Sequence, residues 1–151
     1  MIDEGARIRI REWIDEAIAS GATRLAGDND DELLRPTVLA EVADDQKVSC
    51  EEVFGPVVIV NPVDSLDEAL DRANGTRFGL QAGVFTSSID TALRAADRLE
   101  FGGVTVNEAP TFRSDQMPYG GVKDSGNTRE GPAYAVRELT EERLVVIQRQ
   151  V

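Results

Sequence analysis

The sequence is organised around residues 51–60, which read Glu51-Glu52-Val53-Phe54-Gly55-Pro56 and continue as Val57-Val58-Ile59-Val60. Two carboxylates, an aromatic ring and a Gly-Pro break therefore stand at the start of an apolar run that predicts a buried strand. Ligand sites of α/β folds lie in the loops at strand ends, so this segment is a candidate binding site. An acidic pair before a Gly-Pro turn is equally typical of a solvated loop, and these six residues alone do not distinguish the two interpretations.

A second motif lies downstream of the first. Residues 117–126 read Met117-Pro118-Tyr119-Gly120-Gly121-Val122-Lys123-Asp124-Ser125-Gly126. They belong to residues 107–131, a segment with little periodicity and much Gly, Pro, Asp and Ser, which begins where Asn107 closes an apolar segment. This composition predicts a long loop, and loops longer than about 12 to 15 residues in compact domains are usually functional or disordered. The second motif therefore favours the functional interpretation of the first.

Helical and strand periodicities predict the elements around the two motifs. Residues 2–19 carry apolar side chains on one helical face, and Gly21 follows as a C-terminal cap. Ser65 and Glu68 have the capping-box pattern at the start of a second helix. The predicted helices span residues 2–19, 66–74, 89–99 and 133–139. The predicted strands span residues 25–26, 36–39, 57–63, 80–86, 104–106 and 143–147.

The order of these elements predicts the fold class. Strands and helices alternate between residues 57 and 106 at a spacing that favours βαβ crossovers and a parallel sheet. We therefore predict an α/β fold in which the apolar strand 57–63 is central. The strand predicted at 143–147 has no helix after it and leaves an exposed edge, which invites pairing with another chain. Residues 27–32 predict an acidic surface turn.

Charge and length set limits on the function. The 151 residues suit one domain, and their 28 acidic and 16 basic residues give a net charge of −12. This charge disfavours binding to nucleic acid and to anionic membrane surfaces, because both would repel it. The sequence shows neither a secretory leader nor an apolar run of the roughly 18 residues that a membrane span requires. We therefore expect a cytoplasmic protein.

Two residue types exclude further chemistry within this chain. The sequence contains no histidine, which excludes Ser-His-Asp triads, Cys-His pairs and histidine-based metal sites. Its single cysteine, Cys50, excludes an internal disulfide and suits a reducing compartment. Chemistry that needs a histidine is therefore excluded within these 151 residues, and we predict no metal site in them.

In this order, the two motifs resemble those of the aldehyde dehydrogenase superfamily, whose catalytic domain carries the patterns E-E-[VI]-F-G-P and P-[FY]-G-G-x-K-x-S-G. Residues 79–86 and 102–107 also look like segments of that family. The resemblance implies a three-layer αβα catalytic domain with a mostly parallel sheet, of which residues 1–139 form the C-terminal part. Residues 140–151 are then a C-terminal oligomerisation strand and tail. The thiol nucleophile, the glutamate general base and the cofactor-binding domain are expected upstream of Met1.

The resemblance assigns the cofactor contacts by position. Glu52 matches the family glutamate that accepts hydrogen bonds from the nicotinamide ribose, and Phe54 matches the aromatic residue that packs near the nicotinamide. A carboxylate can accept two hydroxyls at once, and an aromatic face excludes water beside the hydride-bearing ring. Cys50 does not stand where the family has its nucleophile, so we interpret it as a small residue without a catalytic role.

The second motif supplies the candidate substrate contacts. By resemblance Tyr119 lines the aldehyde tunnel, with core packing as the alternative. Arg113 lies in the variable part of the loop, in a region that shapes the substrate entrance in this family. A guanidinium there suits an aldehyde that carries a carboxylate or a phosphate. The alternative is an exposed loop arginine that pairs with Asp115.

The resemblance implies that the whole enzyme oxidises an aldehyde to a carboxylic acid through a cysteine thiohemiacetal and thioester, with NAD or NADP accepting hydride. The substrate is a small anionic aldehyde if Arg113 contacts it. This chain alone is expected to be inactive and to form homo-oligomers through its last strand. Two other hypotheses stay open: a stand-alone interaction module that pairs with a separate partner, and an unrelated α/β binding domain.

Overall fold

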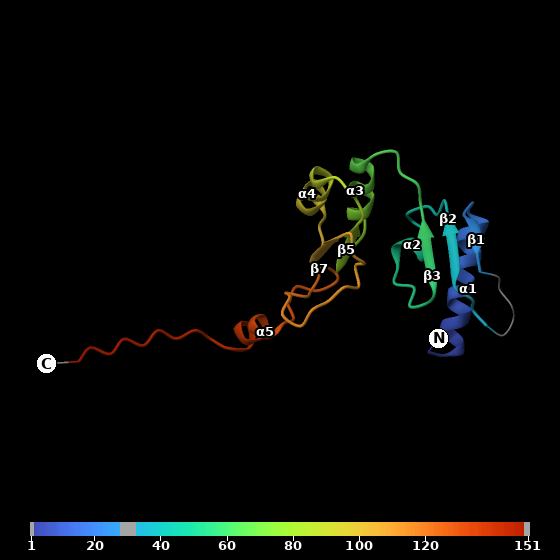
Figure 1. The fold of residues 1–151 in the computed structure, drawn as a ribbon. Coiled ribbons are helices and arrows are strands. Elements are labelled where there is room, and N and C mark those ends of the chain that lie inside the picture. Colours follow the sequence, from blue (N-terminus) through green and yellow to red (C-terminus); the bar gives the residue numbers. More distant parts are fainter. Residues whose placement is uncertain (1, 28–32, 150–151) are drawn as a thin grey trace. The chain divides into compact units, whose positions relative to one another are not determined.

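The computed structural model describes residues 2–27 and 33–149. The chain divides into two compact units, Met1–Ser65 and Leu66–Val151, and each unit combines helices with strands (Figure 1). The mixed α/β class predicted from the sequence is therefore confirmed. Residues 28–32 of the predicted acidic turn lie outside the described residues.

The first unit combines helices with a three-stranded sheet (Figure 1). Its elements are α1 (Glu4–Ala19), β1 (Thr23–Ala26), β2 (Thr37–Ala40), α2 (Lys47–Cys50) and β3 (Val57–Val60). Strand β2 lies between the other two strands, antiparallel to β1 and parallel to β3. The sheet is therefore mixed rather than purely parallel.

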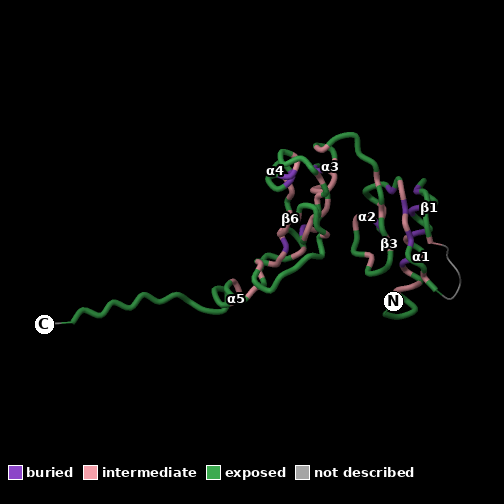
Figure 2. Tube along the Cα trace, viewed as in Figure 1, coloured by how far each residue is buried: buried purple, intermediate pink, exposed green. Residues whose placement is uncertain are grey.

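Helix α1 packs its apolar face against the sheet and α2. Asp3 caps the helix, since its carboxylate accepts a 2.7 Å hydrogen bond from the Ala6 N–H. Gly21 follows the helix with a φ of +111°, which a side chain would disfavour. Figure 2 marks the buried positions in purple. The buried residues of this core are Ile10, Ile14, Ala17, Ala22, Leu39, Val42 and Val48.

The prediction of a central, buried strand at 57–63 is wrong in two respects. Strand β3 ends at Val60, and within the described residues it forms an edge of the three-stranded sheet. Val57 and Ile59 pack against the core, whereas Val58 and Val60 are exposed. A continuous apolar run predicts burial on both faces of a strand, but α1 covers only the face that carries Val57 and Ile59.

The second unit contains a βαβ unit and a short antiparallel pair. Its elements are α3 (Leu66–Asn74), β4 (Phe78–Gly79), β5 (Gln81–Val84), α4 (Ile89–Arg98), β6 (Gly103–Val106), β7 (Val122–Lys123) and α5 (Pro132–Leu139). Strands β5 and β6 are parallel and are connected through α4, whereas β4 and β7 are antiparallel. The predicted βαβ crossover is thus confirmed for β5, α4 and β6, while β3 and β5 belong to different sheets.

Local signals position α4 as the sequence predicts. Ser88 caps the helix, because its Oγ accepts a 3.3 Å hydrogen bond from the Thr91 N–H. Ala92 and Ala95 are the buried residues of the helix. Leu93, in contrast, is exposed.

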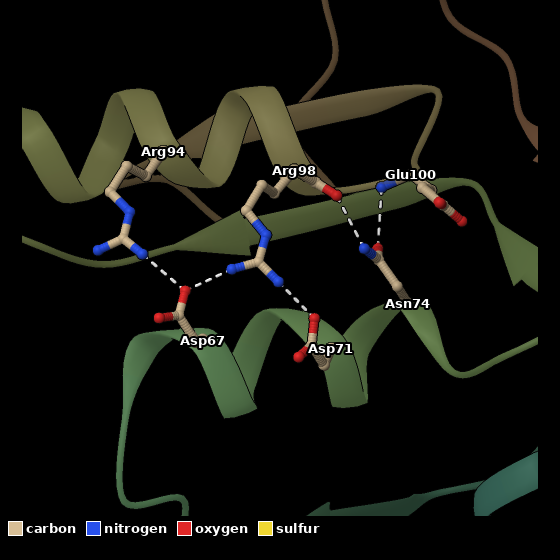
Figure 3. A network of polar contacts seen from close by, with 6 residues as sticks. All are labelled: Asp67, Asp71, Asn74, Arg94, Arg98 and Glu100. Atoms are coloured by element: carbon tan, nitrogen blue, oxygen red, sulfur yellow. Dashed lines mark hydrogen bonds and ion pairs between the residues drawn. The ribbon is translucent and has the colours of Figure 1, made fainter.

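Polar side chains join α3 to α4 (Figure 3). Asn74, the last residue of α3, donates a 2.7 Å hydrogen bond to the Arg98 carbonyl and accepts one of 2.9 Å from the Glu100 N–H. These bonds satisfy backbone groups at the end of α4 that have no helical partner. The surrounding ion pairs are exposed and each contributes little to stability. They connect Asp67 with Arg94 and Arg98, and Asp71 with Arg98.

The two parallel strand pairs end in the same way. Asn61 follows β3, and its side-chain amide donates to the Val42 carbonyl over 2.9 Å and accepts from the Val42 N–H over 3.0 Å. Asn107 follows β6 and makes the same two bonds with Thr86, over 2.9 Å and 2.8 Å. In both cases the partner lies two residues beyond the end of the neighbouring strand. An asparagine side chain therefore extends each ladder where backbone pairing stops.

The strand predicted at 143–147 is not formed. Residues 140–149 contain neither helix nor strand, and Figure 2 draws this segment in green as exposed. Ile147 is 85% exposed. A strand needs a neighbour for its backbone hydrogen bonds, and no described residue of the chain supplies one. The association of this segment with another chain stays a prediction.

Glycines allow loop 107–131 to pack on the backbone of the second unit. A Cβ at Gly102 would lie 1.7 Å from the Gly120 carbonyl oxygen, so the two backbones touch only because Gly102 lacks a side chain. Beside this contact, the Gly79 N–H donates a 3.0 Å hydrogen bond to the Ser125 hydroxyl. The Gly-Gly and Ser-Gly parts of the second motif thus have a packing role.

Gly102→Ala is expected to destabilise the second unit by about 3 kcal/mol, because the new methyl group must displace the Gly120 backbone. Urea unfolding followed by far-UV circular dichroism measures the loss. The fluorescence of Trp13, which lies in the first unit, should not change.

The matched control is Gly126→Ala. No atom lies within 4 Å of a Cβ at Gly126, and its φ is +104°, so only the left-handed conformation costs stability, about 1 kcal/mol. Equal losses in the two variants would contradict the packing explanation of Gly102.

Candidate functional site

Residues 51–56 form a loop between α2 and β3 that is anchored at several points. Val53 packs against the core, and its carbonyl accepts a 3.0 Å hydrogen bond from the Arg9 guanidinium. The Pro56 carbonyl accepts a 2.8 Å hydrogen bond from the Thr37 N–H. These contacts fix the backbone on either side of the predicted cofactor contacts.

Glu52 and Phe54, the predicted cofactor contacts, are both exposed. Phe54 has a φ of +50°, and its side chain is 78% exposed. The left-handed conformation costs a non-glycine residue about 1 to 2 kcal/mol. Burial of the ring does not repay this cost, and strained residues of this kind cluster at functional sites. The loop therefore offers a carboxylate and an aromatic face to a ligand.

The position of this loop corrects one argument made from the sequence. Residues 51–56 lead into β3, and Pro56 is bonded to Thr37, the first residue of β2. The loop therefore lies at the amino ends of the parallel strands β2 and β3. Ligand sites of open α/β sheets lie outside the carboxyl ends. The assignment of a candidate site to this loop is therefore supported by the residues of the loop and not by that general rule.

Cys50 is the last residue of α2 and lies directly before the candidate loop. Its thiol is partly exposed and donates a long hydrogen bond of 3.6 Å to the Asp45 carbonyl. This contact does not give the sulfur a basic partner that could activate it as a nucleophile. The structure is consistent with a small residue at the end of a short helix.

The loop of the second unit brings together Arg113 and Tyr119, which were predicted separately as candidate substrate contacts. The Arg113 guanidinium carbon lies 4.2 Å from the centre of the Tyr119 ring, in a cation–π contact. Arg113 also forms an ion pair with Glu130, not with Asp115 as the sequence analysis considered. Glu130 lies 17 residues further along the chain, so local charge pairing could not indicate this partner.

Glu130 also connects to Tyr119 through the backbone. The Tyr119 N–H donates to the Glu130 carbonyl over 3.2 Å, and the Glu130 N–H donates to the Tyr119 carbonyl over 2.6 Å. Tyr119 is half-buried, so its side chain both packs and remains accessible. Arg113 and Glu130 both lie within the predicted loop 107–131, and their opposite charges were the only sequence signal for the three-residue cluster of Arg113, Tyr119 and Glu130.

Arg113 keeps part of its guanidinium available. Within the described residues, its only hydrogen bond is the one that its Nη2 donates to Glu130, and 48% of its side chain is exposed. A guanidinium has five N–H donors and can bind a carboxylate or phosphate through a free edge. The cluster can therefore accept an anion beside Tyr119.

Two further kinds of feature are absent from the described residues. No three His, Cys, Asp or Glu side chains gather there in a way that could hold a metal ion. The same residues include no helix with the length and apolar character needed to cross a membrane.

Comparison with known proteins identifies the family. The model of the "Aldehyde dehydrogenase family" matches residues 1–145. The chain is 48% identical over 140 residues to the 3-sulfolactaldehyde dehydrogenase of Priestia aryabhattai. The matched residues are 92% of this chain and 29% of that protein.

Two solved structures agree with this match. Aldehyde dehydrogenase 21 of Physcomitrella patens, in complex with the reaction product succinate, is 40% identical with a TM-score of 0.88, over 93% of this chain and 30% of that protein. The NADP-dependent glyceraldehyde-3-phosphate dehydrogenase of Bacillus halodurans, complexed with NADP, is 39% identical with a TM-score of 0.86, over 95% and 30%.

These matches cover nearly all of this chain and less than a third of each relative. They exclude the hypothesis of an unrelated α/β binding domain. The order of the two motifs, the glycine contacts of the second motif and the family match all agree. The chain belongs to the aldehyde dehydrogenase family.

Proposed function

We propose that this chain is the C-terminal part of the catalytic domain of an NAD(P)-dependent aldehyde dehydrogenase, together with its C-terminal oligomerisation strand. The whole enzyme oxidises an aldehyde, by preference one with an anionic group, to a carboxylic acid in the cytoplasm. The observation that carries this proposal is the family match over residues 1–145 at less than a third of the length of the relatives. Exposed Val58 and Val60 on β3 support it, because a strand of this composition normally has cover on both faces.

The residues of the first unit fit a nicotinamide cofactor. Glu52 is exposed and supplies only acceptors, which suits the two hydroxyls of a ribose. Phe54 presents its ring to solvent from a strained backbone, which suits packing beside a planar ring. When bound, NAD or NADP accepts a hydride from the substrate. The chain's own part is to orient the cofactor with Glu52 and to exclude water with Phe54.

In the whole enzyme, Glu52→Gln is expected to raise KM for the nicotinamide cofactor about tenfold to a hundredfold. The amide keeps one acceptor and loses the charge, and hydrogen bonds to charged groups are worth about 1.5 to 3 kcal/mol. Steady-state kinetics with varied cofactor measures the change. Glu51→Gln, at the neighbouring carboxylate, is the control and should leave KM unaltered. An equal effect of both variants would argue against a specific role of Glu52.

The residues of the second unit favour an anionic substrate. Arg113 has a free guanidinium edge beside the half-buried Tyr119. The named activities of the three relatives above involve a sulfonate, a carboxylate or a phosphate. We therefore assign Arg113 to the anionic group of the aldehyde and Tyr119 to the wall of its tunnel.

Arg113→Ala in the whole enzyme is expected to raise KM for anionic aldehydes about tenfold, because the anion loses a charge-assisted hydrogen bond. KM for neutral aldehydes of similar size should stay within about twofold. Arg137→Ala, at an exposed arginine of α5, is the control and should change neither value. Equal rises for anionic and neutral aldehydes would reject the assignment of Arg113.

The first measurement is the mass of the native polypeptide in its source cells, detected with an antibody raised against this chain. A product about three times as long supports the proposal, since this chain covers 29% of its sulfolactaldehyde relative. Purified alone, the 151-residue chain is expected to show no aldehyde oxidation. Activity of the chain alone would contradict the proposal.

The exposed C-terminal segment favours a second candidate function, that of an interaction module. A native product of 151 residues would point to an interaction module that pairs with a separate partner carrying the missing residues. The observation in favour is the exposed apolar run Leu144, Val145, Val146 and Ile147, which has the composition of a strand without a neighbour. Recovery of aldehyde oxidation when such a partner is added would support this candidate.

The isolated chain is expected to self-associate or aggregate through residues 143–147. Analytical ultracentrifugation should show the full chain as an oligomer, and a chain ending at Thr140 should shift to the monomer. Ile2→Lys, which removes a single exposed apolar side chain at the other end, is the control. A full chain that is monomeric and melts in one sharp transition would contradict this expectation.

A further inference from the structure

The ammonium group of Lys123 is held by three acceptors of the second unit. Its Nζ lies 2.8 Å from the Asn74 carbonyl, 3.2 Å from the Thr76 carbonyl and 3.0 Å from the Glu100 carboxylate. A lysine ammonium has three N–H donors, so this set uses all of them. The side chain is 24% exposed, whereas the ion-paired arginines of the same unit are 38% to 54% exposed.

These contacts tie loop 107–131 to the ends of two helices. Asn74 is the last residue of α3, where carbonyl groups lack helical partners and the helix dipole favours a positive charge. Glu100 follows the end of α4, and its N–H is bonded to the Asn74 side chain. Lys123 itself lies in β7, within the loop. One side chain thus connects the loop to α3 and to Glu100, the second residue after α4.

Two features indicate that the lysine is required here. Lys123 has a φ of +53°, a conformation that a glycine or asparagine would adopt at lower cost. Lys47 is the only other lysine among the 16 basic residues of the chain, so arginine is the usual basic residue of this sequence. A compact ammonium suits two carbonyls and a carboxylate around one point, which a planar guanidinium does not.

We infer that Lys123 is the positioning residue that sets the place of Tyr119 and Arg113 in the substrate tunnel. The inference deepens the proposed function and rests on it. Lys123 touches neither substrate nor cofactor and acts through the backbone of the loop. Lys123 of β7 pairs with Phe78 of β4. Tyr119, four residues before Lys123, pairs with Glu130. The ammonium of Lys123 therefore fixes β7 close in sequence to the cluster of Arg113, Tyr119 and Glu130.

Hydrogen exchange of the native protein that contains this chain tests the positioning role directly. Lys123→Met should speed exchange of the Tyr119 and Glu130 amides about tenfold, the factor that about 1.4 kcal/mol produces. The Gly103 amide, bonded to the Leu80 carbonyl at the start of the β5–β6 pair, should change by less than about twofold. Lys123→Arg is expected to restore little of the protection.

The matched control is Lys47→Met, at the other lysine of the chain. Lys47 makes an exposed ion pair with Glu16 in the first unit, so its loss should leave the Tyr119 and Glu130 amides unchanged. Unchanged exchange of the Tyr119 and Glu130 amides in Lys123→Met would overturn the inference, because it would show that Lys123 does not hold the loop. An equal change at the Gly103 amide would also overturn it, because it would show only general destabilisation.

Kinetics of the whole enzyme give the second measurement. Lys123→Met should raise KM for anionic aldehydes about tenfold, with kcat changed by less than about threefold and KM for neutral aldehydes nearly constant. Faster loop exchange with an unaltered KM in an active enzyme would overturn the assigned effect on substrate. A native enzyme that oxidises no aldehyde would refute the proposed function, while the exchange experiment still decides whether Lys123 positions the loop.

Discussion

The second unit depends on a backbone contact that only glycine permits. Gly102 and Gly120 lie so close that a Cβ on the first would overlap the carbonyl oxygen of the second. This contact places loop 107–131 directly on the turn before β6, and the Ser125 hydroxyl fastens the loop to Gly79. Glycine packing therefore places the backbone of the loop from which the side chains of Arg113, Tyr119 and Lys123 extend.

Features with a local cause could be predicted from the sequence. Ser88 caps its helix through a bond three residues away, and Gly21 ends a helix through its own backbone, so a short window contains the whole cause. The place of β3 in its sheet depends on its pairing with β2, some 20 residues earlier, and on which elements cover each of its faces. The apolar run at 57–60 indicates neither the neighbouring strand nor the cover, so the prediction of a central strand was wrong.

The candidate site shows the same division. The motif located Glu52 and Phe54 on one loop, and the exposed ring and left-handed backbone of Phe54 agree with a binding role. The pairing of Arg113 with Glu130 could not be predicted, because it spans 17 residues of aperiodic sequence and depends on the Tyr119–Glu130 bridge. A motif is enough to locate residues that act alone, whereas residues that act as a cluster can be located only once the fold is known.

An asparagine follows each of the two parallel strand pairs, whereas the candidate loop 51–56 lies at the amino end of its sheet. Asn61 and Asn107 each use their amide to bond both backbone groups of one residue beyond the neighbouring strand. That closes the carboxyl end of each pair, where ligands of α/β sheets usually bind. In the second unit the chain then continues directly into loop 107–131, so Arg113 and Tyr119, the candidate substrate contacts, follow the carboxyl end of β6. In the first unit the exposed carboxylate of Glu52 lies at the amino end, on an anchored loop outside the sheet.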